Sequence, residues 1–296
     1  MDYSKLKRRS SYPFETIGVA VAFSPRLEAI LGEAKLIADK TGAQLLLMHI
    51  GDRTRTKEAR LDEIISKIGI NEKKTRVIWH EGNPVNTLLE LCKLNIVDLL
   101  ILGAIRKENV LKYYLGSVAR KISRKAKCSV LLLTDPVKEG SRFKKVVVNG
   151  VQNPKTIHTI NTAVYFGNHM GVKQITVATE TDQPGLAMAV ANESTAGEAS
   201  KLRKEFSEEE MNKVHDIVIK VSQQEGIEIL EKSIKGKSGY AIRQYAESKK
   251  ADLLVINSPD VKYGIIDRIF THDMEYILEE IPTNVLIVHS RVAENK

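Results

Sequence analysis

The chain alternates short apolar segments with longer amphipathic segments over nearly its whole length. In the first half, short segments rich in apolar residues predict strands at 17–22, 44–49, 75–79, 98–102 and 129–133. Apolar positions at intervals of three and four residues predict helices between them, at 25–41, 57–68, 84–94 and 116–126. Strands that alternate with helices indicate a parallel sheet with helices on both faces.

Capping residues predict where two of these helices begin. Ser24 before Pro25, and Asn83 before Pro84, each place a side-chain acceptor ahead of a proline at the first helical position. Gly42 is the expected end of the first helix.

The second half repeats this order of elements. ELCKLNIVDLLILG at Glu90–Gly103 resembles QYAESKKADLLVINS at Gln244–Ser258, and KCSVLLL at Lys127–Leu133 resembles PTNVLIV at Pro282–Val288. Matching segments in the same order predict an internal duplication.

The duplication predicts two domains, 1–138 and 139–296, which join within a polar segment that contains Pro136 and Gly140. Residues 181–206 have no counterpart in the first half and are interpreted as a linker inserted into domain 2.

The positive charge belongs to the first half. Residues 1–140 contain 25 Lys and Arg against 16 Asp and Glu, whereas the rest contains 20 against 21. The basic segment RKISRKAK at Arg120–Lys127 could attract phosphate groups or nucleic acid. No aromatic residues are interleaved with these charges, and no helix-turn-helix or zinc pattern accompanies them. We therefore interpret the segment as a solvated helix surface and expect no nucleic acid partner.

Other sequence signals bound the class of protein. No window approaches the roughly 18 apolar residues of a membrane span, and the basic start of the chain lacks the apolar part of a secretory signal. We therefore expect a cytoplasmic protein without a membrane span. Cys92 and Cys128 lie in apolar segments and predict buried thiols. The histidines are scattered, so no metal site is expected.

Several motifs, taken in order, resemble those of the universal stress protein family. They are AFS (Ala22–Ser24), MHI (Met48–Ile50), EGNP (Glu81–Pro84), DLLILG (Asp98–Gly103), GSVA (Gly116–Ala119) and KCSVLLL (Lys127–Leu133). The resemblance implies an α/β, Rossmann-like fold of two tandem parallel five-stranded sheets, each of order 3-2-1-4-5 with helices on both faces. It also implies an adenine nucleotide, ATP or AMP, at the switch between the first and fourth strands.

The resemblance further implies an intramolecular pseudo-dimer of the two domains. The fifth strand is the sheet edge in this family, and an open apolar edge invites pairing. We therefore expect 129–133 and 284–288 to meet antiparallel.

The family's nucleotide-binding members share a pattern of glycine, two residues, glycine, nine residues, and glycine followed by serine or threonine. Gly103 and Gly116-Ser117 fit this pattern, whereas Arg106 stands at the second glycine. Ala22 stands where the family has an aspartate that contacts the nucleoside. The resemblance thus implies a binding site formed by Gly103, Arg106, Gly116, Ser117, Val118, Ala22, Ser24 and Ile50.

The second copy departs further from the pattern. Asn257 replaces the glycine at the strand end, and Thr271-His272 replaces the Gly-Ser pair, so we expect no nucleotide site there. The string KGKSG at Lys235–Gly239 resembles the end of a phosphate-binding Walker A loop, but it lacks that loop's first glycine and aligns with the EGNP turn. We reject it as a phosphate site.

These observations predict a non-catalytic, cytosolic stress-response or regulatory protein whose first domain binds an adenine nucleotide weakly. One alternative is an interaction scaffold without a ligand, whose partners bind the basic first domain. The other is an enzyme that hydrolyses a nucleotide phosphate; the sequence shows no general base or acidic metal cluster beside Gly116-Ser117.

Overall fold

The computed structural model describes residues 11–106, 113–136, 143–151, 155–181, 211–221, 226–258 and 274–289 of the 296-residue chain. The chain divides into two compact units, of which unit 1 combines Met1–Arg142 with Asn284–Lys296 and unit 2 is Phe143–Thr283. Except for Thr181, the predicted insertion lies outside the described residues. The two sequence repeats, 1–138 and 139–296, stay a prediction about how the chain arose.

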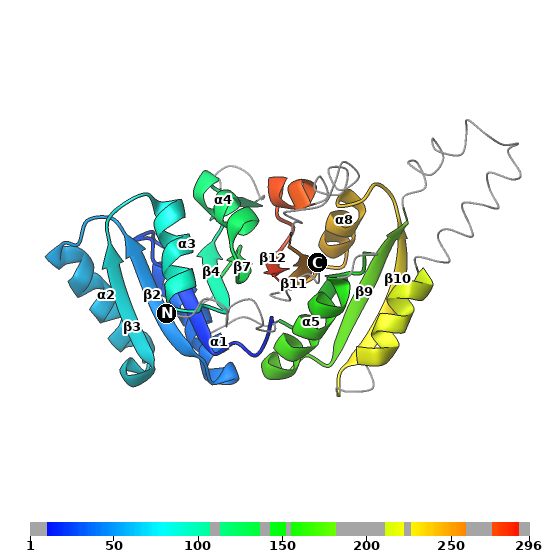
Figure 1. Cartoon of the computed structure of the whole chain (residues 1–296), viewed down its shortest axis with the longest axis horizontal. Coiled ribbons are helices and arrows are strands. Elements are labelled where there is room, and N and C mark those ends of the chain that lie inside the picture. Colours follow the sequence, from blue (N-terminus) through cyan, green and yellow to red (C-terminus); the bar gives the residue numbers. More distant parts are fainter. Residues whose placement is uncertain are drawn as a thin grey trace, which may run out of the picture. The chain divides into compact units, whose positions relative to one another are not determined.

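Unit 1 is built on strands in the order β3-β2-β1-β4-β7-β12 (Figure 1). The first five run parallel, in the order 3-2-1-4-5 that the resemblance implies. The strands are β1 (Thr16–Ala20), β2 (Gln44–Ile50), β3 (Thr75–His80), β4 (Leu99–Gly103), β7 (Ser129–Leu133) and β12 (Asn284–Val288), with a separate hairpin of β5 (Ile105–Arg106) and β6 (Tyr113–Tyr114). The helices are α1 (Leu27–Thr41), α2 (Arg55–Ile68), α3 (Pro84–Leu94) and α4 (Ser117–Lys125), with a 3-10 turn at Glu72–Lys74.

The helices of unit 1 form two packed pairs, α1 with α2 and α3 with α4. From β1 the chain crosses outward through β2 to β3, and then returns past β1 to β4 and β7. Right-handed crossovers in opposite directions place their helices on opposite faces of the sheet. The strands β1 and β4 are neighbours in the sheet. The connection after β1 leaves toward one face of the sheet, and the connection after β4 leaves toward the other.

One predicted helix boundary is confirmed and another is wrong. The Asn83 side chain accepts hydrogen bonds from the first amides of α3, as predicted. The predicted start of α1 at Ser24 is wrong, because residues 24–26 form a turn and Arg26 is the N-cap. The Leu27 amide donates to the Ser24 carbonyl at 3.2 Å, which closes this turn before the helix begins.

The expectation of two separate five-stranded sheets is wrong. The strand β12, from the end of the chain, pairs with β7 of unit 1, so that unit has six strands in its sheet. The pairing is antiparallel, with Leu286 opposite Leu131, and this confirms the predicted meeting of the two fifth strands. All five residues of each strand are buried, which gives the physical reason for the pairing: an open β7 edge would expose an apolar strand.

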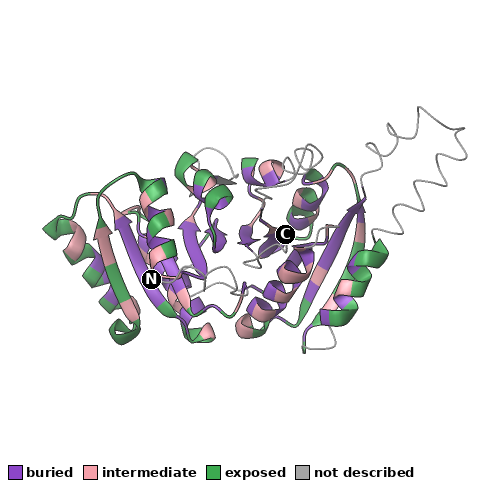
Figure 2. Cartoon of the chain, viewed as in Figure 1, coloured by how far each residue is buried: buried purple, intermediate pink, exposed green. Residues whose placement is uncertain are grey.

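Unit 2 repeats the parallel order with strands β10-β9-β8-β11. Its strands are β8 (Val146–Asn149), β9 (Gln174–Thr181), β10 (Glu228–Lys235) and β11 (Leu253–Asn257), and its helices are α5 (Thr156–Met170) and α8 (Tyr240–Ser248), with further helical residues at 211–221 and 274–279. The outer strand of each unit, β3 in unit 1 and β10 in unit 2, is largely exposed, whereas the other large strands of each unit are mostly buried (Figure 2).

An aspartate makes the same contact in each unit. Oδ2 of Asp98 accepts hydrogen bonds from the amides of Glu15 and Thr16, both at 2.9 Å. Oδ2 of Asp252 accepts from the amides of Lys144 and Lys145 at 2.9 and 2.8 Å. Each carboxylate, placed just before the fourth strand of its unit, fixes the start of the first strand. This equivalence supports the predicted duplication.

Among the residues that the structure describes, no helix is both long enough and apolar enough to cross a membrane.

Candidate functional site

The candidate site of unit 1 lies at the carboxyl ends of β2, β1 and β4. These three strands are hydrogen-bonded neighbours, and they end at Ile50, Ala20 and Gly103. Ala22 and Ser24 follow β1 in the loop that leads to α1. In sheets of this kind, ligands bind where the connections after two neighbouring strands leave toward opposite faces. In unit 1 this position lies after β1 and β4, and we call it the crevice.

Gly103 permits a close approach of α1 to the end of β4. A Cβ atom added at Gly103 would lie 2.7 Å from Cδ1 of Ile30, which is less than any normal contact. Gly103 is not among the glycines with positive φ, so packing and not an unusual backbone conformation explains the glycine.

The loop after β4 returns to the same place before α4 begins. The antiparallel pairing of β5 with β6 matches Ile105 with Tyr114, so the two ends of the loop leave the sheet side by side. The start of this loop at Gly103 and its end at Gly116 are each two residues from that pair. Residues 107–112 and the side chain of Arg106 lie outside the described part of the structure, so the role predicted for Arg106 stays a prediction.

The first turn of α4 presents free amides. Gly116 is the N-cap, with φ −60° and ψ 156°, and no side chain caps the helix. This φ is open to any residue, so the backbone conformation of Gly116 does not itself require a glycine. The amides of Ser117 and Val118 have no partner within the helix, both residues are exposed, and the first turn contains no acidic residue. Such a helix start favours an anion.

Sequence reasoning missed Arg26, which spans the crevice. Its Nη1 donates to the carbonyl of Ala104 at 2.7 Å, and its Nη2 donates to the carbonyl of Thr134. These carbonyls lie just beyond the last paired residues of β4 and β7, where the ladder offers them no donor. The planar guanidinium therefore satisfies both strand ends and adds a positive charge at the crevice.

Sequence reasoning also missed an aromatic group at the other end of the crevice. Phe23, His49 and Trp79 contact one another, with ring centroids 4.9 to 5.9 Å apart. Nδ1 of His49 lies 2.9 Å from the carbonyl of Val21. His49 therefore links the end of β2 to the loop that carries Ala22. The sequence placed His49 at the end of a predicted strand, and that position gave no signal of the contact.

In unit 2 the corresponding crevice is filled by side chains. Asn257 ends β11 as Gly103 ends β4, and its Oδ1 accepts a hydrogen bond from Thr159 of α5. Thr159 is the fourth residue of its helix, as Ile30 is in α1. The Asn257 Nδ2 group also lies 3.2 Å from Oγ1 of Thr156. The positions of Gly103 and Ile30 in unit 1 are thus occupied in unit 2 by Asn257 and Thr159, which are hydrogen-bonded.

The start of α8, after KGKSG, already holds a carboxylate. Oε1 of Glu180 accepts from the amide of Ile242 at 2.8 Å, and Oε2 accepts from the amide of Gly239 at 3.0 Å. A phosphate bound by a Walker-type loop would need these same donors. The contact supports rejection of KGKSG as a phosphate site.

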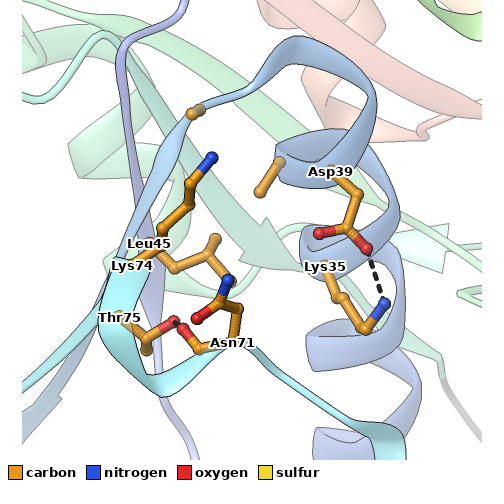
Figure 3. Close-up of a pocket in the computed structure, with 8 residues that line it drawn as sticks. Lys35, Asp39, Leu45, Asn71, Lys74 and Thr75 are labelled. Carbon is orange, nitrogen blue, oxygen red and sulfur yellow. Dashed lines mark hydrogen bonds and ion pairs between the residues drawn. The ribbon is translucent and has the colours of Figure 1, made fainter.

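A small cavity of about 120 Å³ lies at the amino ends of the unit 1 strands, opposite the candidate site (Figure 3). It is bounded by α1 and by the starts of β2 and β3. Lys35 and Asp39 form an ion pair of 2.5 Å at its rim, so this lysine's charge is already compensated. Ligands of such sheets bind at the carboxyl ends of the strands, and we assign no function to this cavity.

The strand order and the change of crossover direction between β1 and β4 define unit 1 as a Rossmann-like α/β domain. Residues 52–134 match the universal stress protein family. The similarity to this family therefore covers residues 52–134, which lie within unit 1.

Comparison with individual known proteins gives further similarities. A segment of 59 residues is 36% identical to a universal stress protein of Methanocaldococcus jannaschii; it covers 20% of this chain and 35% of that protein. The fold of nearly the whole chain resembles a candidate universal stress protein from Pseudomonas aeruginosa UCBPP-PA14 (TM-score 0.68, 15% identity, 96% of this chain and 94% of that one). It also resembles a universal stress protein from Archaeoglobus fulgidus DSM 4304 (TM-score 0.58, 14% identity, 96% and 98%).

Proposed function

We propose that this protein is a non-catalytic stress-response or regulatory protein that binds an adenine nucleotide weakly in the crevice of unit 1. The observation that carries the proposal is the start of α4, where amides without a side-chain cap follow a loop whose two ends meet at β4. Arg26 adds a guanidinium at the same end of the crevice. Amides of a helix start and a guanidinium are both suited to phosphate oxygens.

The end of the crevice that would hold the nucleoside offers fewer hydrogen-bonding groups than the family pattern. Ala22 is exposed and cannot accept a hydrogen bond from a ribose or base. The loss of one charged hydrogen bond of roughly 1.5 to 3 kcal/mol lowers affinity about tenfold to a hundredfold. We therefore expect ATP or AMP to bind more weakly than in family members that keep the aspartate.

Calorimetric titration of the full chain with ATP tests the proposal. We expect one weak site, lost in Gly116→Val because the added side chain blocks approach to the backbone. The double variant Ala22→Asp with Arg106→Gly restores the family pattern and should bind more tightly. If this double variant is folded and still binds no nucleotide, the helix start is only a cap and the scaffold alternative is favoured.

The phosphohydrolase alternative requires a general base or an acidic metal ligand beside Gly116. The first turn of α4 has no acidic residue, and α4 carries the basic residues Arg124 and Lys125 in its last turn. We expect no phosphate release from ATP beyond the rate in buffer, and sustained release would favour the enzyme. A cytoplasmic location is part of the proposal and is testable by fractionation.

A further inference from the structure

The last strand of the chain is hydrogen-bonded to the crevice of unit 1. Oδ1 of Asn284, the first residue of β12, accepts from the amide of Thr134 at 2.9 Å and lies 3.3 Å from its hydroxyl. The carbonyl of the same Thr134 accepts from Arg26, which also holds Ala104. Four residues thus connect the C-terminal strand to the first residue after β4.

These contacts are buried, so the loss of one of them should affect the next. Thr134 is 3% exposed and Ala104 is 5% exposed, so water cannot readily replace a lost partner of either. Without the Asn284 oxygen, the amide and hydroxyl of Thr134 lose an acceptor, and of its described bonds the Leu133–Thr134 peptide group keeps only the one that its carbonyl accepts from the Ala104 amide at 2.8 Å. The Thr134 carbonyl belongs to the following peptide group, so a shift of Thr134 would displace that carbonyl and release Arg26.

Arg26 can hold its carbonyls and bind an anion at the same time. A guanidinium has five N–H donors, and the described residues take two of them. Both bonds fix the plane of the group at the crevice, so less side-chain entropy is lost when an anion binds.

We propose that Asn284 is a positioning residue for Arg26, acting through Thr134, and that anion binding in unit 1 therefore depends on the C-terminal strand. The ligand part of this inference rests on the proposed nucleotide function; the positioning part does not. Asn284 was predicted only as part of a strand, and no motif marked its side chain.

The test compares Asn284→Leu, which keeps the size and removes the acceptor, with Asn284→Asp, which keeps an acceptor oxygen. The matched control is Ser129→Ala, because Ser129 joins β12 to β7 at the other end, through a bond from the His289 amide at 3.4 Å. Each full-length variant is titrated with ATP. The rate at which phenylglyoxal modifies Arg26 is measured by mass spectrometry without ligand.

We expect Asn284→Leu to raise the modification rate of Arg26 several-fold and to weaken ATP binding about tenfold. Asn284→Asp and Ser129→Ala should behave like the native protein in both measurements. An unchanged modification rate in folded Asn284→Leu overturns the inference, as does an equal rise in Ser129→Ala, which would indicate general loosening of β12.

Two further measurements keep the outcomes separable. If the native protein binds no ATP, the proposed function fails, and the modification rate still decides whether Asn284 positions Arg26. If Asn284→Leu does not fold, Asn284→Ser replaces it, and amide exchange is measured in the native protein. Coupling between two sites is reciprocal, so ATP should slow exchange of the Thr134 amide; unchanged exchange with ATP bound counts against the inference.

Discussion

Unit 1 has a packing contact between Gly103 and Ile30 where unit 2 has a hydrogen bond between Asn257 and Thr159. The difference can be tested by introducing the unit 2 pair into unit 1. Gly103→Asn alone places a Cβ 2.7 Å from Ile30 and leaves a polar amide against an apolar neighbour that is 6% exposed. Overpacking costs about 1 to 3 kcal/mol, and an unsatisfied buried group costs about 1 to 3 kcal/mol. Together we expect a loss of roughly 2 to 6 kcal/mol.

Ile30→Thr alone removes apolar volume and buries a hydroxyl, for an expected loss of about 2 kcal/mol. In the double variant, the new threonine can bond the new asparagine as Thr159 bonds Asn257. The double variant should therefore lose about 1 to 2 kcal/mol less than the two single losses added together. Gly103→Ala is the matched control, because it adds the Cβ without a polar group.

Urea unfolding followed by tryptophan fluorescence provides the assay. Trp79 is the only tryptophan of the chain and lies in unit 1, so the signal reports the unit that was changed. The reasoning is refuted if the losses of the two single variants add within about 0.5 kcal/mol in the double variant, because the residues would then not interact.

Four other substitutions have expected outcomes. Asp98→Ala should lower the free energy of unfolding by about 3 kcal/mol or more, because it strands two amides, and Asp252→Ala should cost less since Asp252 is partly exposed; urea unfolding compares them. Glu180→Ala should destabilise α8 by about 1 to 2 kcal/mol through loss of its cap, seen as faster amide exchange at Ile242. Burial lowers the pKa of His158, so the unfolded chain binds its proton more readily, and stability should fall as the pH drops below about 6.5. His158→Gln should flatten this dependence in thermal melts between pH 7 and 5, and an unchanged slope would contradict the assignment.

Elements of the fold could be predicted where local patterns agree with packing. The buried strands of unit 1 are continuous apolar segments, and Gly42 and Asn83 mark helix ends by side-chain chemistry that acts within a few residues. Ser24 and Pro25 carried the same kind of signal and misled, because a turn that ends at Arg26 uses a serine and a proline equally well. Their local pattern does not distinguish a turn from a helix start.

Contacts across the sequence could not be predicted in this way. Arg26 lies 78 residues from Ala104 and 108 from Thr134 along the chain, and nothing in its neighbours indicates that its side chain reaches two strand ends. His49 was recognised as a strand end, but its bond to Val21 follows from strand pairing. The pairing of β12 with β7 was predictable because a family resemblance supplied the strand order, not because either strand differs from the others.

The position of β12 in unit 1 also affects how the protein is synthesised. The strand that closes β7 leaves the ribosome about 150 residues after β7 itself, which at about 5 to 20 residues per second is a delay of roughly 8 to 30 seconds. During that time the nascent chain carries an apolar edge whose final partner has not been made. A transcript broken before codon 284 would leave this edge open permanently. Such products should precipitate or be degraded, even though they contain every residue of the proposed nucleotide site and, of the residues that support it, lack only Asn284, which positions Arg26.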